Sequence, residues 1–312
     1  MKKRLFVIAL ATMAALSGCG EARMRQPDET ALPALEYTRP EGEIAGVQAQ
    51  KSLKSQGKLS DGSDYILYAS NELEINTDIL QTSLKTEKVL ADVLKDITML
   101  TLNVESIGPG ACSDLTVIQQ VNLGENVRII EENAFAKCTT LNRVQFPEGL
   151  EEIGNYAFHG CSSLWSADIP SGVTRMGRQI FVDCDALRSI VIDSDVGEAS
   201  FAECKALREV IFGENCQKIG KEAFSDCTGI KNLRIGDSVS RIEDQAFSGC
   251  ENIAYVYFPA SIKYIGHLAF ANVQRVNTFE CQNLVEYYKI KREEDFAKDS
   301  QLAWMAPKEV KE

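Results

Sequence analysis

Cysteine and histidine are the side chains in this sequence whose types could do redox, metal or nucleophilic chemistry. The 312 residues include ten cysteines and two histidines, His159 and His267. A zinc site usually pairs its ligands as Cys-x-x-Cys, and no two cysteines here have that spacing. The patterns His-Glu-x-x-His, Gly-x-Ser-x-Gly and Gly-x-x-x-x-Gly-Lys are also missing from the sequence. We therefore expect no catalytic residue, metal ligand or cofactor, and we expect both histidines at surface turns.

The acidic stretch at residues 193–198 is the other group that could bind an ion. Asp193, Asp195 and Glu198 surround Gly197, and calcium prefers six to eight oxygen ligands. The spacing is not that of an EF-hand loop. A solvated tight turn is therefore the interpretation that we favour over a calcium site.

An internal repeat organises most of the cysteines. A unit of the form Ala-Phe-x-x-Cys recurs along the chain, with its phenylalanines at Phe135, Phe158, Phe181, Phe201, Phe224, Phe247 and Phe270. Their sequence numbers rise by 23 at every step except the one from Phe181 to Phe201, where they rise by 20. A further step of the usual length toward the N-terminus reaches Cys112, so about eight copies are visible. Such a fixed period is the signature of a repeat architecture.

The fourth copy of the repeat is the short one. Its missing residues fall between Ile192 and Val196, within the acidic stretch.

Each copy contains two apolar groups. In one copy, Leu141, Val144 and Phe146 alternate with polar residues, which predicts a short half-buried strand. Leu150 and Ile153 form the second group, which leads into the next phenylalanine. One copy cannot bury both groups alone. We therefore predict that the copies stack into a repeat solenoid, mainly β, with a continuous core.

The unit resembles the BspA-like, or Treponema pallidum-type, class of bacterial leucine-rich repeats. It follows the pattern Leu-x-x-Val-x-Phe-Pro-x-x-Leu-x-x-Ile-Gly-x-x-Ala-Phe-x-x-Cys over residues 97–281. The resemblance implies a curved solenoid with a concave parallel sheet, and an association with surface display and adhesion. Helical spacing of apolar residues between 84 and 97 predicts a small helical N-terminal cap over residues 61–96. Residues 282–312 leave the pattern and are interpreted as a C-terminal cap and tail.

Six cysteines occupy the same position of the repeat. Equivalent side chains in a parallel stack lie about 4.8 Å apart, which permits a disulfide by distance alone. Parallel side chains that point into a core do not have the orientation that a disulfide needs, and Leu115 and Val273 occupy this position at the two ends. We therefore expect buried, unreactive thiols, with one or more disulfides as the alternative.

The N-terminus has the features of a targeting segment. Lys2, Lys3 and Arg4 precede an apolar stretch at residues 5–16, which is too short for the roughly 20 residues that span a bilayer. The ending Leu-Ser-Gly-Cys resembles a lipobox, which implies that residues 1–18 are a lipoprotein signal peptide and that Cys19 is lipidated. A plain secretory signal is the alternative. Gly20, in place of aspartate, favours an outer-membrane or cell-surface lipoprotein, and residues 19–60 are predicted to be a flexible tether.

The charge of the chain restricts its partners. The formal net charge is -12 and becomes -15 if residues 1–18 are removed. This argues against nucleic acid as a partner, because binding to it requires an excess of lysine and arginine. We expect contact with the membrane only through the N-terminal lipid anchor.

The candidate ligand-binding residues face outward from the predicted sheet. Outward positions in the C-terminal half bring together large contact residues, with both tyrosines expected to be exposed: Val191, Ile211, Arg234, Tyr255 and Tyr257. Beside them, Arg188, Arg208 and Lys231 form a basic column, which suggests an acidic or carboxylated target. The alternative is that such residues merely suit the surface of a sheet.

Two classes of function follow from this sequence. The favoured one is a non-catalytic, lipid-anchored surface protein that presents its concave face to a protein or glycan ligand, as in adhesion. The alternative is a structural or accessory capture subunit of a cell-envelope complex.

Overall fold

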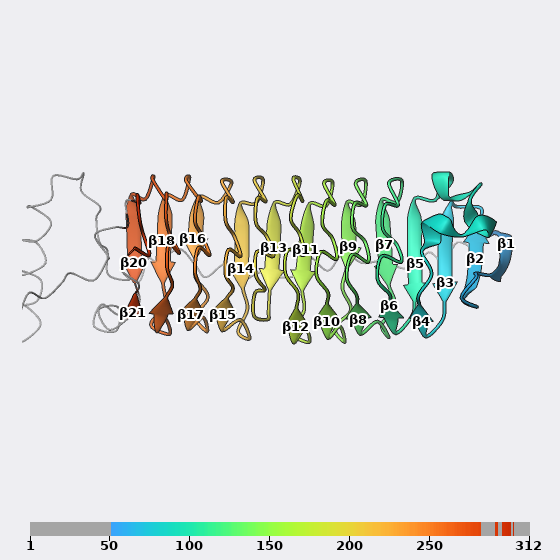
Figure 1. The fold of residues 1–312 in the computed structure, drawn as a ribbon, viewed down its shortest axis with the longest axis horizontal. Helices are drawn as coiled ribbons and strands as arrows, with labels where there is room; N and C mark the ends of the chain where they lie inside the picture. Colours follow the sequence, from blue (N-terminus) through green and yellow to red (C-terminus); the bar gives the residue numbers. More distant parts are fainter. Residues whose placement is uncertain (1–50, 282–290, 293–294, 301, 303–312) are drawn as a thin grey trace, which may run out of the picture.

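The long strands of the solenoid form one face of the molecule. The computed structural model describes residues 51–281, 291–292, 295–300 and 302, and its coils are stacked side by side along one axis (Figure 1). In this part of the chain, nine long strands follow one another at the repeat period. They are β5 (Met99–Asn103), β7 (Gln120–Leu123), β9 (Arg143–Gln145), β11 (Ser166–Ile169), β13 (Ser189–Ile192), β14 (Glu209–Phe212), β16 (Asn232–Arg234), β18 (Tyr255–Phe258) and β20 (Thr278–Cys281). The predicted solenoid of parallel strands is confirmed.

A second ladder of two-residue strands forms the opposite side of each coil. Its strands are β4 (Ile79–Leu80), β6 (Ser106–Ile107), β8 (Ile129–Ile130), β10 (Glu152–Ile153), β12 (Arg175–Met176), β15 (Lys218–Ile219), β17 (Arg241–Ile242), β19 (Tyr264–Ile265) and β21 (Lys291–Arg292). Neighbouring strands of this ladder pair in parallel. In the shortened repeat a single bridge between Val196 and Ile219 replaces a strand, so the missing residues do not break the stack.

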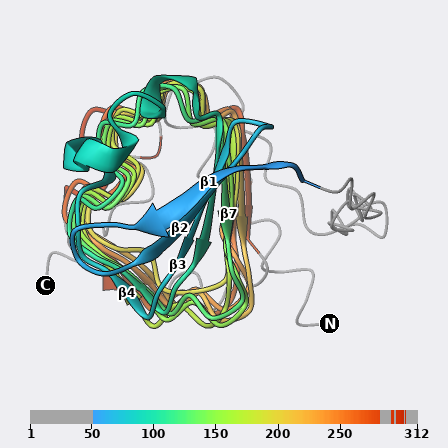
Figure 2. The same cartoon turned by 90° about the vertical axis from the view of Figure 1, so that its right-hand side faces the viewer.

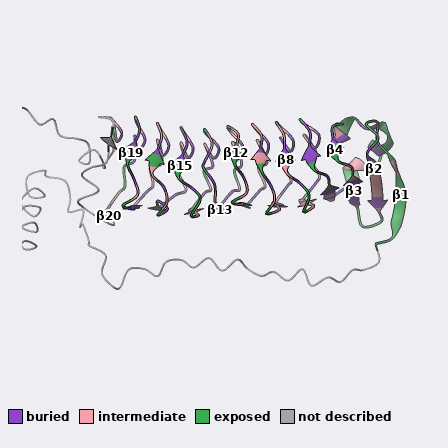
Figure 3. Cartoon of the chain, turned by 90° about the horizontal axis from the view of Figure 1, so that it is seen from below, coloured by how far each residue is buried: buried purple, intermediate pink, exposed green. Residues whose placement is uncertain are grey.

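The long strands pair in parallel and in constant register, but not as one continuous sheet. Their ladder divides into three sheets: β5, β7 and β9, which pair onward from an additional N-terminal strand, β3 (Glu72–Asn76); β11, β13 and β14; and β16, β18 and β20. We call the face made by these strands the concave face, although its curvature is slight in the two side views (Figures 1 and 3). Because the register is constant, equivalent residues of successive repeats form straight rows along this face.

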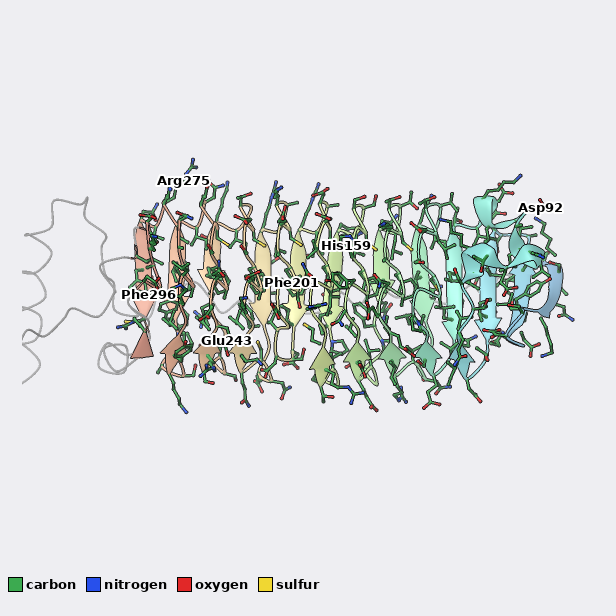
Figure 4. All side chains as sticks on the ribbon, in the orientation of Figure 1. Asp92, His159, Phe201, Glu243, Arg275 and Phe296 are labelled. Carbon is green, nitrogen blue, oxygen red and sulfur yellow. The ribbon has the colours of Figure 1, made fainter. Side chains whose placement is uncertain are left out.

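A column of phenylalanine rings fills the core. From Phe135 to Phe270, successive rings lie 5.2–5.3 Å apart between centroids and within 15° of parallel. Phe201, labelled in Figure 4, keeps its place in this column even though its repeat is the shortened one. Three phenylalanines at or just after the ends of long strands, Phe146, Phe212 and Phe258, contact the column edge-on. Such stacked and edge-on contacts add to the stabilisation that burial of the rings provides.

Two left-handed backbone positions flank the phenylalanine in each coil. One lies two residues before it and one lies two residues after it, and φ is between 50° and 73° at Asn133, Lys137, Tyr156, Gly160, Gln179, Asp183, Ala199, Glu203, Glu222, Asp226, Gln245, Gly249, Leu268 and Asn272. These residues let the chain turn tightly around the phenylalanine. Most of them are not glycine, so each coil contains some backbone strain.

The N-terminal end differs from its prediction in two ways. The segment predicted to be a tether up to residue 60 already contains β1 (Leu53–Lys58), which pairs in antiparallel fashion with β2 (Asp64–Tyr68). The cap predicted to be helical is formed by these strands and by three short 3-10 helices, η1 (Leu84–Thr86), η2 (Lys88–Leu90) and η3 (Leu94–Asp96). The apolar spacing that predicted an α-helix instead places Leu84 and Leu90 in the core at separate turns. Figure 2 shows β1 and β2 lying across the end of the coil.

The solenoid also begins earlier and ends later than predicted. Strand β3 (Glu72–Asn76) pairs in parallel with β5, and β4 pairs with β6, so a coil precedes residue 97. At the other end, β21 pairs with β19, and Phe296 is fully buried. The interpretation of residue 281 as the last residue of the solenoid is therefore wrong. Residues 1–18, Cys19, the tether up to residue 50 and the tail at 303–312 lie outside the described residues.

Candidate functional site

The candidate binding residues lie on four neighbouring strands of the concave face. We call Val191, Ile211, Arg234, Tyr255 and Tyr257 the concave patch. Val191 and Ile211 are paired across β13 and β14, and Arg234 and Tyr257 are paired across β16 and β18. Strands β14 and β16 belong to different sheets, so the patch crosses an interruption of the ladder. The rows agree with the register expected from the repeat, and the ligand-binding role of the patch stays a prediction.

Arg234 covers Tyr257. The guanidinium carbon lies 3.9 Å from the centroid of the Tyr257 ring, within the range of a cation-π contact. Arg234 also forms an ion pair of 3.5 Å with Asp237, and the Tyr257 residue is only 9% exposed. Burial, followed by the nearby Asp237, raises the pKa of Tyr257. The expectation that both tyrosines are exposed is therefore wrong for Tyr257, because Arg234 lies across its ring.

Tyr255 is held in place by a neighbour on β20. Its hydroxyl donates a hydrogen bond of 2.9 Å to Glu280. Burial, followed by this bond to a carboxylate, raises the pKa of Tyr255 well above its ordinary value, so the hydroxyl stays protonated. The sequence places Glu280 in the outward row beside Tyr257, but it does not reveal this diagonal contact. Tyr255 remains partly exposed.

The basic column lies at the edge of the concave face, one residue before the long strands. Arg188, Arg208 and Lys231 are exposed, and the last two line a shallow depression of about 370 Å³. Lys205 lines the same depression, together with Ala206, Thr228, Gly229 and Asn232. Sequence analysis missed Lys205. It also missed Trp165, which is 49% exposed and precedes Arg188 by one repeat, so its position was readable from the period.

The repeat cysteines are free thiols with a hydrogen-bonding role. Each donates to a backbone carbonyl in the preceding coil, and the carbonyl belongs to the stacked phenylalanine or, for Cys138, to Cys112. The sulfur-to-oxygen distances are 3.0–3.4 Å at Cys138, Cys161, Cys184, Cys204, Cys227 and Cys250. Among the described cysteines none forms a disulfide, which confirms the expectation of buried thiols. Burial raises the pKa of Cys138 and Cys216 to about 12.

The acidic stretch after Ile192 hydrogen-bonds to the next coil. Asp193 accepts a bond of 2.9 Å from the backbone N–H of Asn215. Asp195 accepts bonds of 2.9 and 2.8 Å from the N–H groups of Gln217 and Lys218. In the short repeat, these carboxylates therefore accept hydrogen bonds from backbone N–H groups of the next coil. This agrees with the tight-turn interpretation. In the described part of the chain, no cluster of three His, Cys, Asp or Glu residues is suited to a metal ion.

The two histidines lie in separate coils. His159 Nδ1 lies 3.8 Å from Asp183, and His267 Nδ1 lies 2.6 Å from Asp295. The placement of His159 midway along the solenoid is visible in Figure 4. In the same described part, no helix is long and apolar enough to cross a bilayer.

Comparison with known protein families identifies the repeat. The model of the BspA type leucine rich repeat region matches residues 105–197 and 194–296, with six copies, and so covers more than half of the chain. The chain belongs to the BspA-type leucine-rich repeat family. The match begins after β5. It therefore does not include the coil at the N-terminal end of this BspA-type solenoid, which contains β3.

Solved structures of other bacterial repeat proteins are similar to this chain at low sequence identity. A leucine-rich repeat protein from Bacteroides ovatus is 19% identical over 71% of this chain and 55% of its own, with a TM-score of 0.46. The Treponema pallidum leucine-rich repeat protein is 22% identical over 78% of this chain and 96% of its own, with a TM-score of 0.43. A leucine-rich cell surface protein from Faecalibacterium prausnitzii is 19% identical over 77% and 97%, with a TM-score of 0.32.

The chain spans about half the length of the Bacteroides ovatus protein. A comparison with curated proteins gave no match. The family assignment therefore rests on the match to the BspA-type repeat.

Proposed function

We propose that this BspA-type solenoid is a non-catalytic binding protein, lipid-anchored at the cell surface, and that the concave patch recognises a protein or glycan ligand. The observation that carries this proposal is the contrast along one face. Aromatic and aliphatic residues join Arg234 in the C-terminal half, whereas the outward positions of β7 and β9 hold only polar residues, Gln120, Asn122, Arg143 and Gln145. Tyrosine and arginine contribute a large part of the binding energy in protein interfaces.

The contacts within the patch prepare it for binding. Tyr255 is fixed by Glu280, and Arg234 is fixed by the Tyr257 ring and by Asp237. Side chains that are already ordered lose little conformational entropy when a ligand binds. A rigid tyrosine beside an oriented guanidinium therefore offers contact area and a directed charge at low entropic cost.

The test is binding by surface variants. The mature chain is immobilised and exposed to a panel of purified extracellular matrix proteins and uncharged polysaccharides, and to the envelope fraction of the producing cells. We expect Tyr255→Ala and Arg234→Ala each to weaken binding by about tenfold, which corresponds to about 1.4 kcal/mol. Gln145→Ala, on the polar half of the same face, is the matched control and should bind normally.

Each outcome of this test has a clear meaning. If the two patch variants melt normally and bind as well as wild type, the concave patch is not the recognition surface. Capture of components from the producing cell's envelope alone would contradict the proposed adhesion-like role and favour an accessory subunit of an envelope complex.

Anchoring is tested separately through Cys19. The lipobox-like sequence at residues 16–19 supports lipidation of this thiol. Cys19→Ala should release the protein from the membrane fraction and abolish the mass increase of the attached acyl chains. Unchanged membrane association together with an unmodified mass would show that the anchor is not this cysteine.

A further inference from the structure

Four successive coils place one exposed residue each at the same corner, immediately before a long strand. Trp165 precedes β11, Arg188 precedes β13, Arg208 precedes β14 and Lys231 precedes β16. The backbone N–H of Arg188 donates to the carbonyl of Trp165, and that of Arg208 donates to Arg188, both at 2.9 Å. The residues are therefore neighbours, with one coil spacing of about 4.8 Å between successive backbones. We call these four residues the edge column.

In the coils on either side of the edge column, neutral residues occupy the same corner. Trp165 N–H donates to the carbonyl of Asn142 in the coil before, and Ala254 N–H donates to that of Lys231 in the coil after. The cations are therefore confined to three adjacent coils. A ligand that matches the column must be extended along the solenoid axis, and it must bear its negative charges within that short length.

The three cations of the edge column are not neutralised by the protein. Across the described residues, Arg188, Arg208 and Lys231 have no carboxylate within 4.0 Å, whereas Arg175 and Arg241 pair with Glu152 and Glu243. Lys205, beside the column, forms only a long ion pair of 3.6 Å with Glu203. Glu209 follows Arg208 but belongs to the next row, where it pairs with Ser189 on the concave face. Three adjacent free cations on a chain of net charge -12 create a local site for an anion.

The surface beside the cations is open because its residues are small. Ala206 and Gly229 line the depression between Arg208 and Lys231. A Cβ atom at position 229 would lie 2.5 Å from the carbonyl oxygen of Leu207, so a side chain there would displace the neighbouring coil. The result is a shallow depression rather than a deep pocket, which suits a chain lying along the surface.

Trp165 adds an aromatic surface to the same row. It is the single aromatic residue among the large exposed apolar side chains of the described segments. The face of an indole ring is electron-rich and attracts the weakly positive C–H groups of a sugar ring. An exposed indole in line with cations is therefore a combination that suits a charged sugar.

We propose that the edge column binds an anionic polysaccharide, whose carboxylate or sulfate groups contact Arg188, Arg208 and Lys231 while a sugar ring stacks on Trp165. The distance between cations in successive coils, about 4.8 Å, is comparable to the length of one sugar unit. An acidic peptide fits less well, because the backbone groups that a peptide would need for added-strand pairing are already used between coils. This inference rests on the proposed surface display, but it uses residues outside the concave patch.

The experiment measures binding of the mature protein to heparin, polygalacturonate, dextran and poly-glutamate at two salt concentrations. We expect binding to heparin or polygalacturonate that weakens with salt, and little binding to dextran. The triple variant Arg188→Gln, Arg208→Gln, Lys231→Gln should bind at least about tenfold more weakly. The triple variant Lys218→Gln, Lys221→Gln, Lys263→Gln makes the same change in net charge elsewhere and should stay close to wild type.

The tryptophan separates a sugar from any polyanion. Trp165→Ser should weaken polysaccharide binding by about threefold or more and leave poly-glutamate binding unchanged. The proposal is overturned if neither charged polysaccharide binds, if the two triple variants lose binding equally, or if poly-glutamate binds as tightly as the polysaccharides. Tyr255→Ala is expected to leave polysaccharide binding intact, so failure of the concave patch and failure of the edge column can be distinguished.

Discussion

The repeat cysteine combines packing with a weak hydrogen bond. Leu115 and Val273 occupy the equivalent position in the end repeats and are also buried, so an apolar side chain is sufficient there. A thiol fills similar space and in addition donates to a carbonyl of the preceding coil. Because a thiol loses little when it is desolvated, it suits this position better than a hydroxyl does.

Thiol reactivity tests this interpretation of the cysteines. Under denaturing, non-reducing conditions, alkylation should modify the nine cysteines other than Cys19. In the native protein at pH 8 we expect almost no reaction, because burial raises the pKa of the repeat thiols and excludes the reagent. Cys281, which is only partly buried and has a pKa raised to about 11, should react first. A shortfall of two thiols after denaturation would mean that a disulfide is present.

The sequence predicted which residues form rows on the concave patch, but not the contacts between their side chains. The rows of outward residues follow from the period, because a parallel stack with constant register allows only one alignment. The placement of Arg234 over Tyr257 depends on side-chain rotamers and on Asp237, which the period does not encode. Trp165 lies one repeat before Arg188, so its row follows from the period, but it precedes its strand and is not one of the outward strand positions.

At the scale of the coil, the left-handed positions control the tightness of the turns. Gly160 has φ +71°, and a Cβ added there would be no closer than 3.5 Å to another atom. Gly160→Ala therefore tests backbone strain without a clash, and it should lower the free energy of unfolding by about 1 kcal/mol. Gly160→Asn should be less harmful, because asparagine tolerates this conformation better. Lys137→Gly, at the equivalent position of the preceding coil, should stabilise the protein in urea unfolding. Equal stability of all three variants would contradict this account.

The N-terminal cap depends on a buried carboxylate. Glu87 accepts hydrogen bonds from Ser60, and from Thr82 at 2.6 Å. Burial acts to raise the pKa of Glu87, but these hydrogen bonds outweigh it and hold the pKa below its ordinary value of 4.5. A lowered folded-state pKa stabilises the protein fully above the unfolded value, and this stabilisation disappears as pH falls through the folded-state value.

The pH dependence of one variant tests the role of Glu87. Glu87→Gln should lower the free energy of unfolding by about 1–2 kcal/mol at pH 7, because the charged acceptor is lost. The difference from wild type should shrink as the pH falls below the ordinary value of 4.5 and through the lowered pKa of Glu87 in the folded protein. Asp64→Asn, at an exposed position of the same cap, is the control and should change little over this pH range. A gap between wild type and Glu87→Gln that does not narrow at all as the pH falls from 7 would show that the ionised state is not what stabilises the cap.

At the scale of the whole molecule, the sequence predicts the solenoid well and its ends poorly. The constant spacing of the phenylalanines identifies the internal coils, and the shortened repeat is still recognisable because its phenylalanine and cysteine remain. The end coils depart from this spacing, since Leu73 pairs with Leu100 and Phe296 follows Phe270 by more than one period. Each end must also shield the core from water, so strands β1 and β2 replace the repeat at the N-terminal end.

The central claim is that recognition uses the C-terminal half of the concave face. Hydrogen exchange of the mature chain, measured alone and with the panel component that it binds, tests this claim most directly. The account predicts slower exchange in the coils that contain β13, β14, β16 and β18, and no change in those that contain β5, β7 and β9. Protection confined to β5, β7 and β9, or to the short strands on the opposite side, would contradict it.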